Sequence, residues 1–308
     1  MIKAYFRPQS CSMIIEGFTY VRNGLKMDYP FLVSIQSLLP VVDRMIVVIG
    51  NSEDGTREAV ENLNDPKIEI IDCVWDEALR SSGAIFRQQA NIGVDALKGD
   101  WGIHIQADEV IHENDLAKLR EQIDLAQARP EVDGLLFPFY HFRGDYFHIQ
   151  NTRRTHPFEI RAFKTGRNVR SYKDSQGFRI FDPNDPADVG KKLKVLKTDI
   201  PIFHYSYTRH PSLMKKKANY FHRFWHGDEW LKAHTDDTLF NFNEVDKLEL
   251  FTGTHPALME PIMAKKDWEF VYDPSQSNMK LKEKFLYWVQ KKYGKRLFGY
   301  KNYELLRH

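Results

Sequence analysis

The chain alternates short apolar runs with segments whose apolar residues recur every three or four positions. The apolar runs predict strands at 13–21, 45–49, 68–71 and 101–105. The periodic segments predict helices at 31–39, 57–63, 85–97 and 114–128. Strands that alternate with helices in this way predict a mostly parallel sheet with helices on both faces, an α/β fold.

The second half of the chain is richer in polar residues. Three more strands and a helix are predicted, at 134–140, 159–164, 201–209 and 212–226. Pro138 places the first of these strands near a sheet edge, because proline cannot donate a hydrogen bond to a neighbouring strand. On the helix, the Lys215–Lys217 run is expected to face solvent.

Composition narrows the class of protein. The 308 residues are 42% hydrophobic and 28% charged, which is typical of a globular protein with one principal domain and an appendage, or with two small domains. No apolar run approaches the roughly 18 residues of a membrane span. Met1–Ser12 lacks the apolar core of a secretory signal. A net charge of +2 gives no indication of a nucleic-acid partner.

The only cysteines are Cys11 and Cys73, too few for a disulfide framework. Such low cysteine usage fits a reducing compartment, so a cytoplasmic protein is expected.

Two adjacent carboxylates, Asp108 and Glu109, follow the strand predicted at 101–105. They would emerge at the carboxyl end of a parallel strand, where open α/β sheets bind ligands. Carboxylates suit Mg²⁺ or Mn²⁺, ions that commonly bind one or two protein carboxylates together with substrate phosphates. The pair therefore indicates either a metal-assisted site for a phosphorylated donor or a solvated turn.

A loop of small and capping residues, Gly50–Thr56, joins a predicted buried strand to a helix. Backbone N–H groups at the start of such a helix can bind an anion or a ribose. An ordinary capped connection is the alternative interpretation.

Four short patterns occur in order along the first part of the chain. They are Arg22-Asn23, Ser52–Thr56, Arg87–Asn91 leading into Gly99–Trp101, and Ala107–Glu109. Together, over roughly residues 13–125, they resemble the nucleotide-sugar-binding half of family 2 glycosyltransferases of GT-A fold. The resemblance implies a Rossmann-like sheet. It also implies sugar transfer from a nucleoside-diphosphate sugar to a hydroxyl acceptor, a glycan or lipid-linked saccharide, with inversion, as in polysaccharide biosynthesis.

The resemblance also assigns site residues. The nucleotide-sugar-binding residues would be Arg22, Asn23, Asn51, Ser52, Asp54, Arg87, Asn91, Gln106 and Ala107. The ligands of Mn²⁺ or Mg²⁺ would be Asp108, Glu109 and His204.

Two departures from the family pattern stand out. No aspartate occurs at positions 49–51, where the family usually has one that contacts the base, so the nucleotide stays open. Gln106 replaces the first aspartate of the metal motif, so metal binding would depend on Asp108 with Glu109 or a distant ligand.

Asp174 lies in the segment where inverting members of the resembled family place the carboxylate that activates the acceptor. The His-Glu pair often seen there is missing, so Asp174 is expected to be the general base, with Asp145 as second choice. A turn residue capping Gly177 is the alternative for Asp174. His204 has a structural alternative as well, because a single histidine in a strand usually packs in the fold.

The domain division follows these assignments. A GT-A catalytic domain is expected at 1–210, with its acceptor half at about 130–210, and a mainly helical extension at 211–308. From Lys280 onward, basic residues outnumber acidic ones nine to two, and aromatic residues are interleaved. Such a helix can lie on an anionic membrane, which would place the protein at the inner face beside a lipid-linked acceptor. A helix packed on the catalytic domain is the alternative.

Two other functions remain open from the sequence. A nucleotidyltransferase of similar fold also uses a carboxylate-bound metal beside a parallel sheet. A non-catalytic protein that binds sugar nucleotides would retain the fold after Gln106 replaced the acid.

Overall fold

The computed structural model describes residues 13–76, 78–79, 83–175, 177–185, 188–236, 238–294 and 296–307. Met1–Ser12, with Cys11, lies outside the described residues, as do Gln176 and Lys295.

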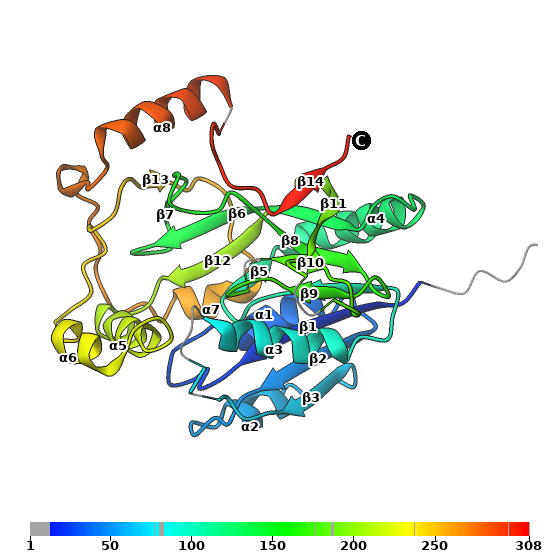
Figure 1. Ribbon diagram of the computed structural model, residues 1–308. Coiled ribbons are helices and arrows are strands. Elements are labelled where there is room, and N and C mark those ends of the chain that lie inside the picture. The colour runs from blue at the N-terminus through cyan, green and yellow to red at the C-terminus, as the bar shows by residue number, and fades with distance from the viewer. Residues whose placement is uncertain are drawn as a thin grey trace, which may run out of the picture.

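The first half of the chain forms a parallel sheet (Figure 1). Its strands, in the spatial order β3-β2-β1-β4, are β1 (Ile15–Val21), β2 (Arg44–Ile49), β3 (Ile68–Asp72) and β4 (Trp101–His104). The helices between them are α1 (Phe31–Leu38), α2 (Thr56–Glu61) and α3 (Ala84–Asp95). The predicted α/β fold is confirmed.

Helices cover both faces of this sheet. On one face, Ile15 and Met45 pack with residues of α1 and of α4 (Leu116–Gln127). On the other face, Phe18 packs closely against α3, where a Cβ added to Gly93 would lie 2.5 Å from the Phe18 ring. Continuous apolar strands require cover on both sides, which explains why they lack a polar face.

The second half extends the same sheet around β6 (Gly134–Arg143). This strand pairs antiparallel with β8 (Phe158–Lys164), which also pairs with β4 and so joins the two halves. On its other side, β6 runs parallel to β11 (Lys191–Lys197) and β12 (Ile202–Tyr207). The remaining short elements are β5 (Glu109–Ile111), η1 (Glu113–Asp115), β7 (His148–Ile149), β9 (Val169–Ser171), β10 (Phe178–Ile180), β13 (Glu249–Leu250) and β14 (Tyr303–Leu305).

The prediction that Pro138 marks an edge strand was wrong, since β6 has neighbours on both sides. The pairing of β6 with β11 ends at Leu136, and its pairing with β12 begins at Phe139. Pro138 lies where β6 exchanges one neighbour for the other. A residue without an N–H is accommodated at this interruption of the ladder.

The C-terminal part combines helices with long irregular segments and one returning strand. The helices are α5 (Pro211–His222), α6 (Asp228–His234), η2 (Ala257–Met259), α7 (Glu260–Met263), η3 (Pro274–Gln276) and α8 (Leu281–Tyr293). In Figure 1, α8 projects from one end of the molecule, whereas β14 lies beside β11, with which it pairs in parallel. Within the described ranges, no helix has the length and hydropathy needed to cross a bilayer.

Candidate functional site

A cavity of about 260 Å³ lies at the carboxyl ends of β1 and β4. It is the place where open α/β sheets bind ligands. Six residues predicted for the site line it together: Arg22, Gln106, Ala107, Asp108, Asp174 and His204.

Asp108 is the carboxylate at the centre of this cavity and is only 8% exposed. Its Oδ1 lies 3.5 Å from His204 Nε2, and its Oδ2 lies 3.5 Å from Lys217 Nζ and 3.8 Å from Arg209 Nη2. Burial raises the pKa of Asp108, but the neighbouring His204, Lys217 and Arg209 side chains outweigh burial and hold that pKa well below its usual range. Asp108 is therefore an anion in the pH range in which the protein works.

Strand pairing brings His204 to Asp108 from far along the chain. β12 pairs antiparallel with β5, which places His204 opposite Glu109, the residue after Asp108. β12 also runs parallel to β6, which places His204 opposite His141. The Nδ1 atoms of the two histidines are 2.8 Å apart, and His141 Nε2 lies 2.7 Å from the backbone carbonyl of His156. Burial, followed by the proximity of the His204 ring, lowers the pKa of His141 to about 3, so the His141 ring is neutral at pH 7.

Glu109 does not line the cavity, contrary to the expectation that it would bind a metal with Asp108. It is fully buried, and both of its oxygens accept hydrogen bonds from the Arg161 guanidinium, at 2.8 and 2.6 Å. Glu109 Oε2 also accepts a hydrogen bond from the backbone N–H of Gln106. The pair therefore fixes the turn that presents Asp108.

Asp108 and His204 are the side chains that suit a divalent cation. Among the described residues, no three or more histidine, cysteine or acidic side chains form a group that could enclose a metal. One oxygen and one nitrogen 3.5 Å apart and facing the same cavity nevertheless fit a cation whose remaining ligands are water and donor phosphates. The residues present thus fit Mg²⁺ or Mn²⁺ bound jointly with a diphosphate.

Asp174 reaches the cavity from the loop between β9 and β10. Lys173 and Ser175, on either side of it, both have positive φ, a strained conformation for residues other than glycine. Its Oδ1 is buried without a hydrogen-bond partner among the described residues. Burial raises the pKa of this carboxyl group. A desolvated carboxylate with a free oxygen in a cavity is suited to accept a proton.

Asp145 does not line the cavity. Its Oδ1 accepts hydrogen bonds from the backbone N–H groups of Phe147 and His148 and lies 2.9 Å from His148 Nδ1. Asp145 holds the turn between β6 and β7, so the second choice for the base is not supported.

Three of the predicted nucleotide-binding residues connect the loops after β1 and β2. Asn23 Oδ1 accepts from the backbone N–H of Glu53, and Ser52 Oγ accepts from that of Asn23. Asp54 accepts from the backbone N–H of Lys26 and from that of Thr56 at the start of α2. These side chains hold together the two loops beside the cavity but do not line it.

The other three predicted nucleotide-binding residues, Asn51, Arg87 and Asn91, do not line the cavity either. Asn51 Oδ1 accepts a hydrogen bond from the backbone N–H of Trp75, which does line the cavity. Asn91 Oδ1 accepts one from the backbone N–H of Ser171, at the end of β9. Arg87 is exposed on α3 and does not line the cavity.

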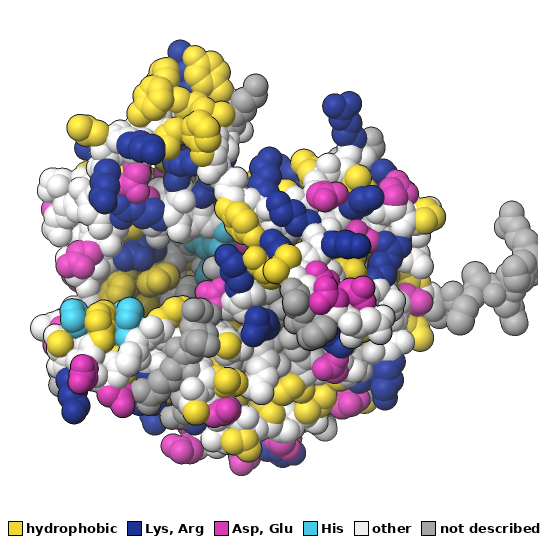
Figure 2. All heavy atoms as spheres, in the orientation of Figure 1, with side chains coloured by type: hydrophobic (Ala, Val, Ile, Leu, Met, Phe, Trp, Pro, Cys, Tyr) yellow, Lys and Arg dark blue, Asp and Glu magenta, His cyan; other side chains and the backbone are white. Residues whose placement is uncertain are grey.

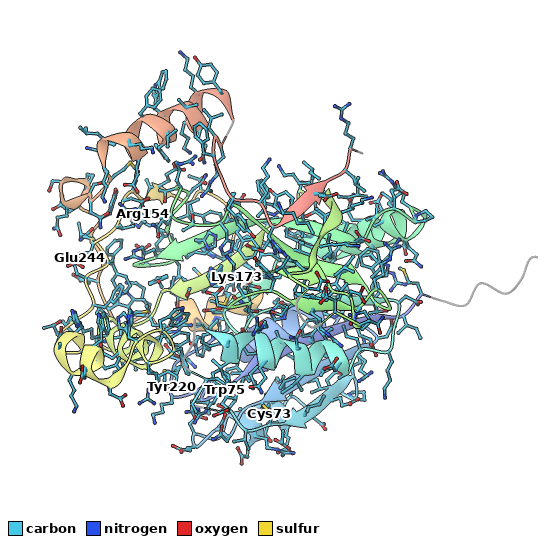
Figure 3. The ribbon with its side chains drawn as sticks, viewed as in Figure 1. Cys73, Trp75, Arg154, Lys173, Tyr220 and Glu244 are labelled. Atoms are coloured by element: carbon cyan, nitrogen blue, oxygen red, sulfur yellow. The ribbon has the colours of Figure 1, made fainter. Side chains whose placement is uncertain are left out.

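Sequence reasoning missed an aromatic wall of the cavity. Its members are Trp75, Phe86, Tyr220, Phe221 and Trp225. Trp75 and Tyr220, labelled in Figure 3, lie near each other although they come from the loop after β3 and from α5. Both contact Arg22, which lies 5.7 Å from the Trp75 ring and donates a hydrogen bond to the Tyr220 hydroxyl.

Lys217 was expected in solvent, and this prediction was wrong. Its side chain is 12% exposed, lines the cavity and lies over the rings of Tyr29 and Phe221. The spacing on α5 carried a signal, because Lys217 precedes Tyr220 and Phe221 by three and four positions and therefore shares their face of the helix.

Residues 31–183 match the model of the family described as glycosyl transferase family 2. The chain belongs to this family. A comparison of this family 2 glycosyltransferase with curated proteins found no match.

A comparison with solved structures matched the chain to two proteins, TarS and a glucosyl-3-phosphoglycerate synthase. S. aureus TarS has 14% sequence identity and a TM-score of 0.41, and the match covers 68% of this chain and 39% of TarS. TarS 1–349 in complex with UDP has 14% identity and a TM-score of 0.40, with 68% and 64% covered. Mycobacterium tuberculosis glucosyl-3-phosphoglycerate synthase, solved with Mn²⁺, UDP and phosphoglyceric acid, has 13% identity and a TM-score of 0.29, with 42% and 43% covered. The match spans less than two thirds of each of these relatives.

Proposed function

We propose that the protein transfers a sugar from a nucleoside-diphosphate sugar to a hydroxyl group of a glycan or lipid-linked saccharide, with inversion and with assistance from Mn²⁺ or Mg²⁺. The observation that carries the proposal is the presence of Asp108, His204 and Asp174 in one cavity. These side chains come from three distant parts of a family 2 glycosyltransferase chain. The proposal needs both a phosphate-binding group and a base, and this cavity contains candidates for each.

The cavity chemistry suits an anionic donor. Arg22 and Lys217 place positive charge in the lining, and the aromatic wall beside Arg22 offers flat surfaces against which a base can stack. When bound at Asp108 and His204, the metal would supply Lewis-acid stabilisation of the leaving diphosphate.

Asp174 is the group that would take the proton from the acceptor hydroxyl. Its Oδ1, which has no hydrogen-bond partner among the described residues, and its raised pKa make it a stronger base than an exposed aspartate. Inversion follows if the hydroxyl, activated by Asp174, attacks the sugar from the side opposite the diphosphate. The donor base stays open, because no aspartate occurs at positions 49–51.

The experiment begins with the donor. UDP-, GDP-, CMP- and dTDP-sugars are screened with Mn²⁺ for thermal stabilisation, and the stabilising donor is then used for transfer assays. Asp174→Asn is expected to lower transfer by about 10²- to 10⁴-fold while donor affinity stays within threefold, because the amide cannot accept the proton. Exposed Asp182→Asn is the matched control and should retain wild-type rates.

The products separate the competing functions. Release of a free nucleoside diphosphate supports glycosyl transfer, whereas release of pyrophosphate would indicate a nucleotidyltransferase. Donor binding without turnover would indicate a non-catalytic binding protein. Normal turnover by Asp174→Asn would refute the assignment of the base.

We also infer that the protein acts in the cytoplasm, at the inner surface of a membrane, and that α8 contacts anionic lipid. The apolar side chains of α8 do not all pack on the catalytic domain: Leu281 is 84% exposed, Phe285 61% and Trp288 50%. Lys292 lies over the rings of Trp288 and Tyr293, which joins positive charge to aromatic surface. Exposed aromatic residues with adjacent lysines fit the boundary between anionic headgroups and acyl chains.

A further inference from the structure

A chain of three hydrogen-bonding groups leads from the loop between β7 and β8 to the cavity. It begins at the backbone carbonyl of His156, continues through the ring of His141 on β6, and ends at His204 on β12. We propose that His141, held by the His156 carbonyl, is a positioning residue that keeps His204 in the tautomer whose unprotonated Nε2 faces Asp108, ready for a divalent cation. The inference rests on the metal-assisted transfer proposed above.

The first step fixes the proton of His141. A carbonyl oxygen can only accept a hydrogen bond, so the 2.7 Å contact with the His156 carbonyl requires a proton on His141 Nε2. The ring is packed between aromatic side chains: Phe139 stacks on it with ring centroids 5.3 Å apart, and His156 meets it edge-on at 4.5 Å. Such surroundings favour the neutral ring, which has one proton and therefore leaves Nδ1 as an acceptor.

The second step fixes the position of the proton on His204. The two Nδ1 atoms are 2.8 Å apart, a hydrogen-bond distance that requires one proton between them. Since His141 Nδ1 accepts, His204 Nδ1 donates. In the neutral His204 ring, Nε2 is then the nitrogen with the free lone pair.

The third step concerns what this lone pair faces. His204 Nε2 and Asp108 Oδ1 are 3.5 Å apart, longer than the roughly 2.7–2.9 Å of a charge-assisted hydrogen bond. A nitrogen lone pair and a carboxylate oxygen directed at the same space repel each other unless a cation lies between them. This geometry matches the usual arrangement in which the second nitrogen of a metal-binding histidine is hydrogen-bonded to a partner that fixes its tautomer.

Strand pairing explains why the arrangement is rigid. His141 and His204 are direct partners in the parallel pairing of β6 and β12, and His204 is also the partner of Glu109 in the pairing of β12 with β5. Three adjacent strands therefore set the ring positions. The one contact from a loop is the His156 carbonyl, which fixes the proton of the His141 ring.

The test reads the tautomer directly in the metal-free protein. Long-range ¹H–¹⁵N correlation spectra of the histidine rings should show a protonated Nδ1 and an unprotonated Nε2 at His204. His141→Phe removes the acceptor and should abolish the preference for this tautomer. His141→Gln supplies an amide oxygen as acceptor and should preserve it. Exposed His234→Phe on α6 is the matched control.

Metal affinity is the second readout, measured as the loss of the free Mn²⁺ electron paramagnetic resonance signal on titration with protein. His141→Phe should weaken Mn²⁺ binding by about 10- to 100-fold, and His141→Gln should stay within about threefold of wild type. Melting temperatures near that of the wild type would exclude unfolding as the cause.

Two results would overturn the inference: a proton on His204 Nε2 in the wild-type protein, or unchanged Mn²⁺ affinity in a folded His141→Phe variant. Neither measurement requires sugar transfer. A protein that shows the expected tautomer and Mn²⁺ binding but transfers no sugar would contradict the proposed function and still support the role of His141.

Discussion

The role of a charged side chain buried beside the cavity depends on the groups that it contacts. Glu109 and Arg161 are both nearly inaccessible and bind each other with two hydrogen bonds. Removing one partner of such a pair typically costs about 3–5 kcal/mol, because the other charge stays buried and unpaired. Glu109 therefore supports the turn that carries Asp108, although the two residues are adjacent and of the same chemical type.

Glu159 on β8 provides a prediction about pH. Burial raises its pKa to about 7 from an ordinary 4.5, Arg161 opposes this change, and Glu109 adds to it. Between these two pH values, the folded protein binds a proton that the unfolded chain has lost. The free energy of unfolding should therefore fall as pH rises from about 4.5 to about 7.

Glu159→Gln removes this titration. At pH 8 the variant should melt several degrees above the wild type, because a rise in pKa from 4.5 to about 7 is equivalent to about 3 kcal/mol, whereas at pH 4.5 the two should melt close to each other. Scanning calorimetry at both pH values measures the difference. Exposed Glu131→Gln is the control and should show no such pH-dependent gain. Equal differences from wild type at the two pH values would contradict the assignment.

At the scale of elements, two C-terminal helices present aromatic residues to different surroundings. The Tyr220 and Phe221 side chains of α5 form part of the cavity wall, with Trp225 just beyond the helix. α8 buries Tyr287 and Val289 but leaves Phe285 and Trp288 in solvent. Figure 2 shows a large hydrophobic area on the projecting helix, with lysine and arginine side chains beside it. Similar sequence patterns thus serve a binding site in one helix and an external surface in the other.

The exposed face of α8 should bind anionic vesicles. Phe285→Ser combined with Trp288→Ser should weaken binding to vesicles containing phosphatidylglycerol by at least tenfold, since each buried aromatic side chain contributes about 1.5–3 kcal/mol. Cosedimentation measures the apparent affinity. Leu125→Ser changes an equally exposed apolar residue on α4 and should have no effect.

Salt provides a second check on the lipid contact. Binding should fall at high ionic strength and on vesicles of neutral lipid, because the lysines contribute through charge. Retained vesicle binding by the double variant, or equal binding to neutral vesicles, would contradict the proposal.

At the scale of the whole molecule, segments from the C-terminal part of the chain pack against the sheet formed by earlier residues. β14 pairs with β11, and Asn302 beside it accepts a hydrogen bond from buried Arg179. Met259 and Ile262 pack against Phe142 of the sheet. The region after residue 210 therefore completes the sheet, the core and the cavity at the same time.

A shortened chain tests this dependence. A protein ending at His210 should lose cooperative thermal unfolding and bind a hydrophobic dye, because it exposes Phe142 and its neighbours and lacks the α5 wall of the cavity. Calorimetry and dye fluorescence measure both effects, with the full chain as reference. A sharp unfolding transition in the shortened protein would show instead that residues 1–210 fold independently.

The sequence predicted the first half of the fold well, because local signals and the final structure agree there. The apolar run at 45–49 is a buried parallel strand, the run at 68–71 is a partly exposed parallel strand at the sheet edge, and the periodic segment at 31–39 forms α1. The short strands β5, β9 and β10 were missed, since two- or three-residue strands are defined by their partners and not by their own pattern. β11 was missed too, although its Lys-Leu-Lys-Val alternation is typical of a half-buried strand.

By itself, the sequence determined the alternation of strands and helices, the family, and the motifs that place Arg22, Asp108 and Asp174 at strand ends and in loops. These features depend on local patterning and on the rule that parallel strands gather their carboxyl ends at one edge. The tertiary structure alone decided that Glu109 binds Arg161, that Lys217 lies beside Asp108, and that His141 contacts His204. Each of those contacts joins residues at least 52 positions apart, and only strand register and helix packing bring such residues together.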